Sequence, residues 1–303
     1  MANIQMTNRR LPEWLTIRLP KPDKIQQVEA MMRAARLHTV CESARCPNLP
    51  ECWSKGSATF MILGDVCTRA CGFCAIKTGK PLELDPQEAL RLAQAAKRMG
   101  LKHIVVTSVA RDDLPDGGAG QFAATIRALH ETIPHAIVEV LTPDFKGKAW
   151  CVRRVVDAQP EIFNHNVETV PRLHAIVRPQ ARYERSLRVL EMVKEMDPRI
   201  YTKSGIMLGL GETRDEVIQV MHDLRRVGVD ALTIGQYLRP TARHLPVQEH
   251  IHPDLFREYQ QIGEQMGFLF VASGPFIRSS YNAIEFSRRV MAERLAKVGV
   301  VEG

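Results

Sequence analysis

Residues 59–74 of this 303-residue chain read TFMILGDVCTRACGFC, and this stretch decides the fold class. The short apolar run Thr59–Leu63 predicts a buried β-strand. Three cysteines, Cys67, Cys71 and Cys74, follow directly after it. In a parallel α/β barrel the loops after the strands carry the active site. The stretch therefore predicts the first strand of such a barrel, with a thiol-rich site at its carboxyl end.

Downstream of this stretch, apolar runs alternate with amphipathic segments. Further strands are predicted at His103–Ser108, Ile137–Leu141, Glu161–His165, Tyr201–Leu208 and Ala231–Gly235. Helices are predicted at Pro86–Met99, Gly120–Glu131, Gly147–Ala158, Tyr183–Met196 and Arg214–Val227. Repeated strand–helix units with right-handed crossovers predict an α/β fold, a partial (β/α)6 TIM-like barrel.

Two flanking regions differ from this alternating pattern. Residues 1–57 are expected to form an N-terminal arm, with a helix at Lys24–Arg36 and a cysteine-rich loop at 41–57. Residues 58–250 are assigned to the barrel, and residues 251–303 to an extension that closes its mouth. In that extension we expect a helix from Asp254, a strand-like run at Phe268–Ala272 and a closing helix after the segment Arg278–Tyr281.

The composition, with 45% hydrophobic and 25% charged residues, is ordinary for a soluble globular protein. No apolar run reaches the roughly 18 residues that a membrane helix needs, and the N-terminus lacks a secretory pattern. We therefore expect a cytoplasmic protein without a membrane partner. The net charge of +7 favours an acidic protein partner over nucleic acid, because no Lys/Arg run of the nucleic-acid-binding kind is present.

The cysteines are concentrated in one part of the chain. They are Cys41, Cys46, Cys52, Cys67, Cys71, Cys74 and Cys151. A long chain without a secretory signal and with six clustered thiols favours a metal or cluster site over disulfides. Cys151, beside Trp150 on a predicted helix, is interpreted as a structural thiol.

The motif Cys67-x3-Cys71-x2-Cys74 provides three thiolates and no fourth. Iron–sulfur clusters are usually held by four protein ligands, so one iron would be left open to substrate. Zinc sites usually pair two C-x2-C units or add histidines, which this spacing does not match. The motif, with Phe73 before its last cysteine, resembles the signature of the radical S-adenosylmethionine superfamily. The resemblance implies that S-adenosylmethionine chelates the open iron of a 4Fe–4S cluster and is cleaved to a 5′-deoxyadenosyl radical.

A second motif, Cys41-x4-Cys46-x5-Cys52, closely resembles the N-terminal motif of the lipoyl synthase family. In that family it implies an auxiliary 4Fe–4S cluster that is consumed as the sulfur source. The family's fourth ligand is a serine of an Arg-Ser-Ser-Tyr segment, which here is residues 278–281. The resemblance assigns this ligand to Ser280, with Ser279 as the competitor. An oxygen ligand is harder than a thiolate and would leave a cluster edge that can open. Without the family, both serines would be interpreted as turn or cap residues.

Three further segments resemble this family. After the second strand, residues 107–118 contain Asp112 and the pair Gly117–Gly118, which implies a place near the methionine end of the cofactor. Ala110 stands where the family has Asp, which puts a role for that side chain in doubt. The resemblance also implies cofactor or substrate contacts for Phe73, for Asn166 and Glu168 after the fourth strand, and for Arg178. It gives Lys203, in the fifth strand, a carboxylate or the iron-bound cofactor as its partner, and it implies further contacts at Arg239, Pro240 and Thr241. Each of these could instead be a satisfied loop residue.

The resemblance implies insertion of two sulfur atoms, at carbons six and eight of a protein-bound octanoyl-lysine. The expected partners are octanoylated lipoyl carrier domains (2-oxoacid dehydrogenase E2 subunits and the glycine cleavage H protein), an electron donor such as ferredoxin or flavodoxin, and an iron–sulfur cluster carrier. The alternatives are a biotin-synthase-like or tRNA methylthiotransferase-like enzyme, an electron-transfer or cluster-carrier protein, and a regulatory zinc protein.

Overall fold

The computed structural model describes residues 11–16, 23–54, 58–280, 285–286 and 290 of the chain. Their centre is an eight-stranded sheet of order β1-β2-β5-β6-β7-β8-β9-β10. All neighbouring strands pair in parallel except β1, which pairs antiparallel with β2. The sheet has two free edges, β1 and β10, so the barrel is partial.

The strands of the sheet are β1 (His38–Thr39), β2 (Thr59–Ile62), β5 (His103–Ser108), β6 (Ile137–Leu141), β7 (Ile162–Asn164), β8 (Tyr201–Leu208), β9 (Ala231–Gln236) and β10 (Phe270–Gly274). The long helices are α1 (Asp23–Ala34), α4 (Glu88–Arg98), α5 (Ala119–Thr132), α6 (Ala149–Val156), α8 (Tyr183–Met196), α9 (Arg214–Arg226) and α10 (Pro253–Gln265). The shorter elements are η1 (Glu13–Leu15), α2 (Val40–Ser43), α3 (Leu49–Ser54), β3 (Val66–Cys67), β4 (Lys77–Thr78), η2 (Phe145–Gly147), η3 (Pro171–Leu173) and α7 (His174–Val177).

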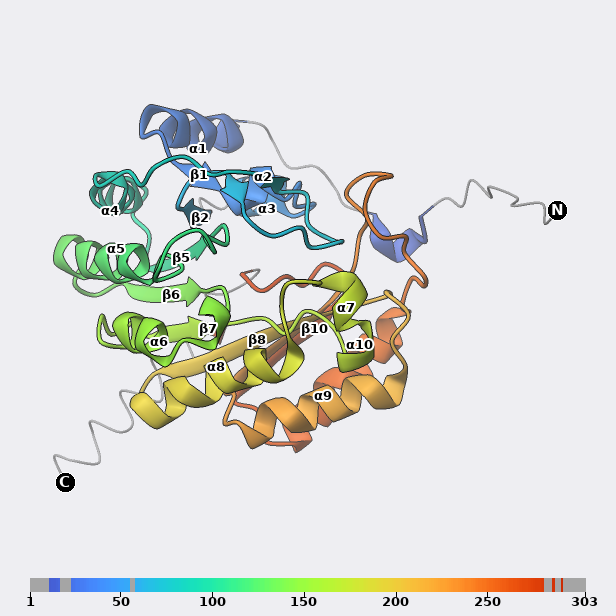
Figure 1. Ribbon diagram of the computed structural model, residues 1–303. Helices are drawn as coiled ribbons and strands as arrows, with labels where there is room; N and C mark the ends of the chain where they lie inside the picture. Colours follow the sequence, from blue (N-terminus) through green and yellow to red (C-terminus); the bar gives the residue numbers. More distant parts are fainter. Residues whose placement is uncertain (1–10, 17–22, 55–57, 281–284, 287–289, 291–303) are drawn as a thin grey trace, which may run out of the picture.

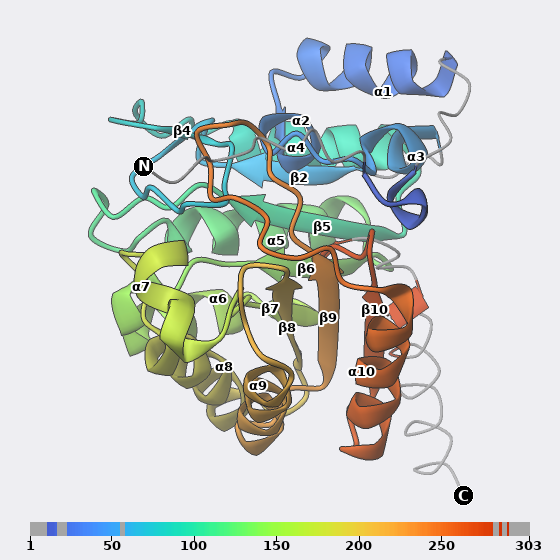
Figure 2. The ribbon, with the colours of Figure 1, turned by 90° about the vertical axis from the view of Figure 1, so that its right-hand side faces the viewer.

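The helices α4, α5, α6, α8, α9 and α10 surround the outer face of the curved sheet (Figures 1 and 2). One long helix lies between each pair of consecutive parallel strands, as right-handed βαβ units require, and the β7–β8 connection also holds the short α7. The six predicted strands are confirmed, with differences of one residue at some ends. The strand-like run near residue 268 forms β10, a seventh parallel strand that continues the sheet beyond β9.

The N-terminal arm is more regular than the sequence indicated. The segment 41–57 was expected to be a loop, but it contains α2 and α3. The Thr39 hydroxyl accepts a hydrogen bond from the Glu42 amide at 3.3 Å and so caps α2, a signal that the cysteine-rich composition obscured. Tyr281 and most of the predicted closing helix lie outside the described residues. Within the described part of the chain, no helix is long and apolar enough to cross a membrane.

The barrel interior contains one ion pair that is removed from solvent. Lys203 Nζ lies 2.8 Å from Glu139 Oε1, and the two side chains are 1% and 0% exposed. His103 Nε2 lies 3.1 Å from the other carboxylate oxygen, and Asn164 donates to Oε1 at 3.2 Å. Burial alone would raise the pKa of Glu139, but Lys203 and His103 outweigh it and lower that pKa to about 2. The carboxylate therefore stays charged, with a partner on each side.

We expect Lys203→Met to lower the free energy of unfolding by about 3–5 kcal/mol, because it leaves Glu139 buried without its main counter-charge. The double variant Lys203→Met/Glu139→Gln should recover a large part of this loss, as measured by urea unfolding. Since the pKa of Glu139 is lowered, its contribution is present above its ordinary value of 4.5 and is lost as the pH falls toward 2. Equal stability of the single and double variants would contradict this account.

Candidate active site

A cavity of about 470 Å³ opens at the carboxyl ends of the parallel strands. The cysteines that line it come from both sequence motifs: Cys41, Cys46, Cys67, Cys71 and Cys74. Ser279 and Ser280 line it from the far end of the chain. The fold therefore collects in one place the residues that the two motifs and the Arg-Ser-Ser segment had singled out separately.

The loop of the first motif is clamped at its base by a small parallel pair of strands. Cys67 in β3 pairs with Thr78 in β4. The backbone amides of Arg69 and Ala110 donate to Cys67 Sγ at 3.4 and 3.3 Å. Ala110 thus contacts the first motif through its backbone. Two amide N–H groups therefore point at this sulfur atom.

Arg69 fixes this loop to the neighbouring strand ends. Its guanidinium donates to both oxygens of Asp112, at 2.7 and 2.9 Å, and to Asp144 at 2.6 Å. Burial would raise the pKa of Asp144, but Arg69 outweighs it and lowers that pKa to about 2. Arg185 adds a second contact to Asp144 at 3.1 Å. Asp112, which the sequence placed near the cofactor, is engaged by Arg69 and is absent from the residues that line the cavity.

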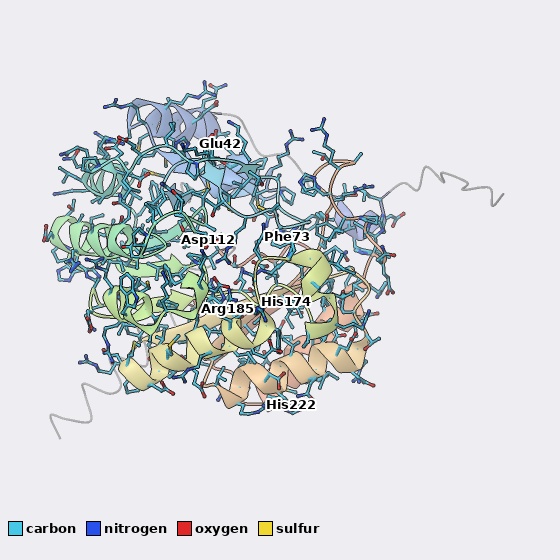
Figure 3. All side chains as sticks on the ribbon, viewed as in Figure 1. Glu42, Phe73, Asp112, His174, Arg185 and His222 are labelled. Atoms are coloured by element: carbon cyan, nitrogen blue, oxygen red, sulfur yellow. The ribbon has the colours of Figure 1, made fainter. Side chains whose placement is uncertain are left out.

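Figure 3 shows Phe73 beyond the carboxyl ends of the strands, close to α7. Phe73 lines the cavity, as the first motif had suggested. Its neighbour Gly72 is bound on both sides, by its amide to the Val177 carbonyl and by its carbonyl to the Leu245 amide, at 2.9 and 3.0 Å. His244 Nε2 lies 3.0 Å from the Cys74 carbonyl oxygen. The cysteine loop is therefore held between α7 and the segment after β9.

The second motif reaches the cavity through two short helices. Cys41 lies in α2, and Cys46 follows it, its amide donating to the Cys41 carbonyl at 2.9 Å. Asn48 Nδ2 donates to the Phe276 carbonyl at 2.6 Å, across 228 residues of sequence. Cys52, one turn farther on in α3, is half-buried and is absent from the residues that line the cavity.

The C-terminal segment crosses the end of β9 at very close range. A Cβ on Gly235 would lie 2.0 Å from the Ile277 carbonyl oxygen, so only glycine permits this approach. Arg278, Ser279 and Ser280 follow directly. Gly235 and Asn48 together bring the serine segment to the loop that carries Cys46. Neither residue was singled out by the sequence, because neither contact is local.

Burial affects three of the thiols that line the cavity. Burial raises the pKa of Cys41 and Cys71, and it raises the pKa of Cys74 to about 12. These thiols hold their protons at neutral pH until a metal displaces them. No three His, Cys, Asp or Glu side chains of the described residues converge on a single metal-ion position. Soft thiols distributed around a cavity fit an iron–sulfur cluster, whose several irons bind ligands at different corners.

Three polar residues line the same cavity as the thiols: Asn166 and Arg178, which are buried, and Glu168, which is half-buried. Arg178 Nη1 donates to the Asn166 carbonyl at 2.8 Å, and Asn166 Nδ2 donates to Glu168 at 3.1 Å. Asn166 Oδ1 and Arg178 Nε are buried without a hydrogen-bond partner in the described structure. Buried polar atoms of this kind normally have a partner, so these two indicate a polar ligand.

Both the backbone conformation and the pKa of Glu168 are unusual. Its φ is 68°, a left-handed conformation that a non-glycine residue rarely adopts. Burial raises the pKa of its carboxyl group, and Arg178 opposes this. Gly205 makes room for the neighbouring Asn166, because a Cβ there would lie 2.9 Å from Asn166 Oδ1. Backbone strain and a carboxyl group of raised pKa at the same residue are typical of a ligand-binding position.

Other predicted positions have different surroundings. Lys203 lies in the ion pair with Glu139 inside the barrel and is not among the residues that line the cavity. Arg239 and Pro240 line the cavity, whereas Thr241 bonds His244 at 2.8 Å. Cys151 is fully buried in α6 among apolar side chains. Arg69 and Asp144 were missed by the sequence analysis. Arg69 could have been noticed within the first motif, but Asp144 carried no signal.

The model of the radical SAM superfamily matches residues 61–224, and that of the N-terminal domain of lipoyl synthase matches residues 2–46. Among curated proteins, the lipoyl synthase of Rubrobacter xylanophilus is 58% identical over 274 residues, covering 90% of this chain and 85% of the relative. The lipoyl synthase of Caldanaerobacter subterraneus is 56% identical over 274 residues and covers 90% and 96%.

Solved structures share the fold at low sequence identity. Methylornithine synthase (PylB) superposes with a TM-score of 0.53 at 12% identity, covering 82% of this chain and 78% of that chain. SuiB of Streptococcus suis bound to S-adenosylmethionine gives a TM-score of 0.57 at 15% identity, covering 74% and 54%. These structures support the fold alone.

Proposed function

Because this chain belongs to the lipoyl synthase family of the radical SAM superfamily, we propose specific roles for the residues around its cavity. The enzyme inserts two sulfur atoms into a protein-bound octanoyl chain and uses S-adenosylmethionine and 4Fe–4S clusters. The observation that carries the residue assignments is the meeting of both cysteine motifs and the C-terminal serines in one cavity. This arrangement and the lipoyl synthase relatives favour this function over other sulfur-inserting enzymes, an electron-transfer protein or a zinc protein.

In the proposed arrangement Cys67, Cys71 and Cys74 hold the cluster that binds S-adenosylmethionine. Cys41, Cys46, Cys52 and Ser280 hold the auxiliary cluster. When bound, these groups supply an electron, a 5′-deoxyadenosyl radical that removes hydrogen atoms from the acyl chain, and the sulfur atoms.

The protein's own side chains position these groups. In this proposal Glu168 accepts hydrogen bonds from an ammonium group or a ribose hydroxyl of the cofactor, and Arg178 donates from its unpartnered Nε. Arg69, held by Asp112 and Asp144, fixes the cysteine loop. The segment 276–280 covers the cavity from the β9 side, which limits the access of water to reactive species.

The enzyme acts on lipoyl carrier proteins, in line with its relatives. We further propose that E2 subunits and the glycine cleavage H protein are such carriers, and that a cytoplasmic ferredoxin or flavodoxin and a cluster carrier serve the enzyme. We also propose three functional parts: residues 1–57 for the auxiliary cluster, 58–250 for the radical barrel and 251–303 for closure.

A single-turnover assay tests these assignments. Anaerobically reconstituted enzyme is mixed with S-adenosylmethionine, dithionite and an octanoyl-lysine peptide, and the peptide is followed by mass spectrometry. We expect a product, in its oxidised form, with two sulfurs gained and two hydrogens lost, together with 5′-deoxyadenosine. Formation of 5′-deoxyadenosine with an unchanged peptide would contradict the sulfur-insertion step while leaving the radical step intact.

Substitutions of the two serines are expected to affect sulfur insertion differently. We expect Ser280→Ala to reduce sulfur insertion by about tenfold or more while 5′-deoxyadenosine still forms, because only the auxiliary cluster loses a ligand. Ser279→Ala, the matched control one residue away, should retain near wild-type insertion. Ser280→Cys should retain the cluster's iron but release sulfur more slowly, because a thiolate binds iron more tightly than an alkoxide. The reverse ranking of the two alanine variants would transfer the ligand role to Ser279.

A further inference from the structure

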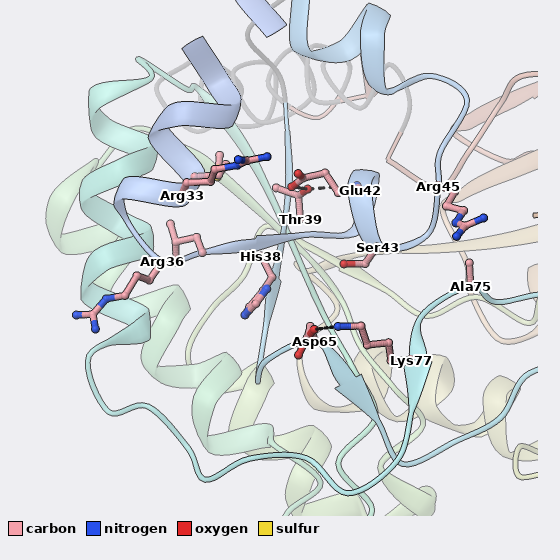
Figure 4. A pocket seen from close by; sticks show the side chains of 12 residues that line it. Arg33, Arg36, His38, Thr39, Glu42, Ser43, Arg45, Asp65, Ala75 and Lys77 are labelled. Carbon is pink, nitrogen blue, oxygen red and sulfur yellow. Dashed lines mark hydrogen bonds and ion pairs between the residues drawn. The ribbon is translucent and has the colours of Figure 1, made fainter. Parts of the chain in front are cut away.

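A second hollow, of about 600 Å³, lies outside the active-site cavity between α1, α2 and β4 (Figure 4). Its charged side chains are Arg33, Arg36, His38, Glu42, Arg45, Asp65 and Lys77, and it is called the basic groove below. Nothing in the assigned chemistry uses it. It lies beside the arm that carries Cys41 and Cys46, and it therefore forms part of the rim of the active-site cavity.

The charges of the basic groove are not balanced internally. Lys77 pairs with Asp65 at 2.9 Å, and the Glu42 carboxylate is engaged by the Thr39 hydroxyl at 2.8 Å. Arg36 and Arg45 are both exposed, and neither lies within ion-pair distance of a carboxylate among the described residues. The nearest electrostatic influence is on Asp85, whose pKa is lowered mainly by Arg91 and to a smaller extent by Arg36. In Figure 4 they lie at opposite ends of the groove. Two guanidinium groups are therefore left to meet a charge from outside the chain.

The backbone at these two arginines is also unusual. Arg36 has φ 51° and Arg45 has φ 53°, and each follows the end of a helix. The amide after each one closes back on the helix, Leu37 to the Met32 carbonyl at 3.0 Å and Cys46 to the Cys41 carbonyl at 2.9 Å. Glycine is the usual residue at such a position, because it takes the left-handed conformation without strain. Both positions instead carry an arginine that lines the groove.

The groove is continuous with the active-site cavity. Arg45 and Ala75 line both hollows, and Ala75 directly follows Cys74. An acyl chain that is attached to a lysine of another protein must enter the cavity while that protein stays outside. The surface that such a protein touches must therefore adjoin the cavity's rim, as the basic groove does.

We propose that the basic groove is the docking site for an acidic surface of the protein that carries the octanoyl-lysine. Arg36 and Arg45 contact carboxylates of that protein, and its acyl-lysine arm passes Arg45 into the cavity. This inference rests on the proposed function and adds to it the location and charge of the partner surface. An acidic electron donor is the other protein that such a groove would suit, and the test separates the two.

The test compares two substrates with dithionite as the reductant, so that no electron-donor protein is present. One substrate is an intact octanoylated carrier protein, and the other is the octanoyl-lysine peptide. We expect Arg36→Gly to raise KM for the carrier protein about threefold to tenfold, with kcat and the peptide kinetics unchanged. The wild-type KM for the carrier should rise with salt and that of the variant should rise less.

Matched variants make the result specific. Arg36→Lys keeps the charge and should retain most of the carrier affinity. Arg153→Gln removes an exposed charge on α6, on the other side of the barrel, and should behave as wild type. Because glycine relieves the left-handed strain, Arg36→Gly should also unfold at the same or a higher temperature than wild type. Lower affinity together with unimpaired stability distinguishes a docking residue from a structural one.

Three outcomes overturn the proposal. If Arg36→Gly showed wild-type kinetics with the carrier, the groove would not be the docking site. An equal loss on carrier and peptide would assign Arg36 to the active site's integrity instead. A defect that appears only with a protein reductant would show that the groove binds the electron donor instead. Loss of peptide turnover in the wild type itself would contradict the proposed function and not this inference.

Discussion

Replacement of Cys71 by alanine is expected to reduce 5′-deoxyadenosine formation by about a thousandfold or more. Cys71 lines the cavity and lies close enough to Cys67 and Arg178 for their charges to affect its pKa. With only three thiolates available to this cluster, the loss of one leaves two, too few to keep one iron open and the rest anchored. All radical chemistry depends on this bound group, so no side chain can compensate.

The measurement is the 5′-deoxyadenosine formed per enzyme in the presence of S-adenosylmethionine and dithionite, beside the iron and sulfide content. Cys151→Ala is the matched control, because Cys151 is a buried thiol of α6 outside both motifs. It should keep a full complement of iron and near wild-type turnover. Undiminished 5′-deoxyadenosine from Cys71→Ala would remove the first motif from the cofactor site.

Replacement of Cys46 by alanine is expected to impair sulfur insertion rather than 5′-deoxyadenosine formation. Sulfur insertion should fall by about a hundredfold or more while 5′-deoxyadenosine still forms. Cys46 lines the cavity, and its loop is tied to the serine segment through Asn48. The loss of this thiolate removes an anchor of the auxiliary cluster and leaves the loop at Cys67, held separately by β3, β4 and Arg69, in place.

The readout is the peptide product by mass spectrometry, together with iron content, which should fall by about half if one of two clusters is lost. Simultaneous loss of 5′-deoxyadenosine would show that the two motifs build one interdependent site. The ratio of the two products is therefore more informative than either activity alone, because a general folding defect lowers both.

The placement of individual residues shows where sequence reasoning succeeds. Asn166 and Glu168 follow a strand end, and the cavity includes both, because strand direction fixes where the following loop must lie. The resemblance gave Lys203 either a carboxylate or the cofactor as its partner, and the structure pairs it with a carboxylate from its place within β8. In register with Asn164 on the neighbouring strand, it points into the barrel interior and meets Glu139.

The sequence by itself determined the parallel strand–helix units and the thiol loop at the end of β2, since these depend on local periodicity and on residue spacing. The resemblance of its cysteine motifs indicated the family. The sequence also identified every cysteine that is proposed as a cluster ligand. The tertiary structure alone decided that Asn48 meets Phe276, that Gly235 admits Ile277 and that Arg69 joins Asp144. It likewise decided that Arg36 and Arg45 face one groove. The physical reason is that these contacts join residues far apart in sequence, or set side chains by the path of the whole chain, so no local pattern encodes them.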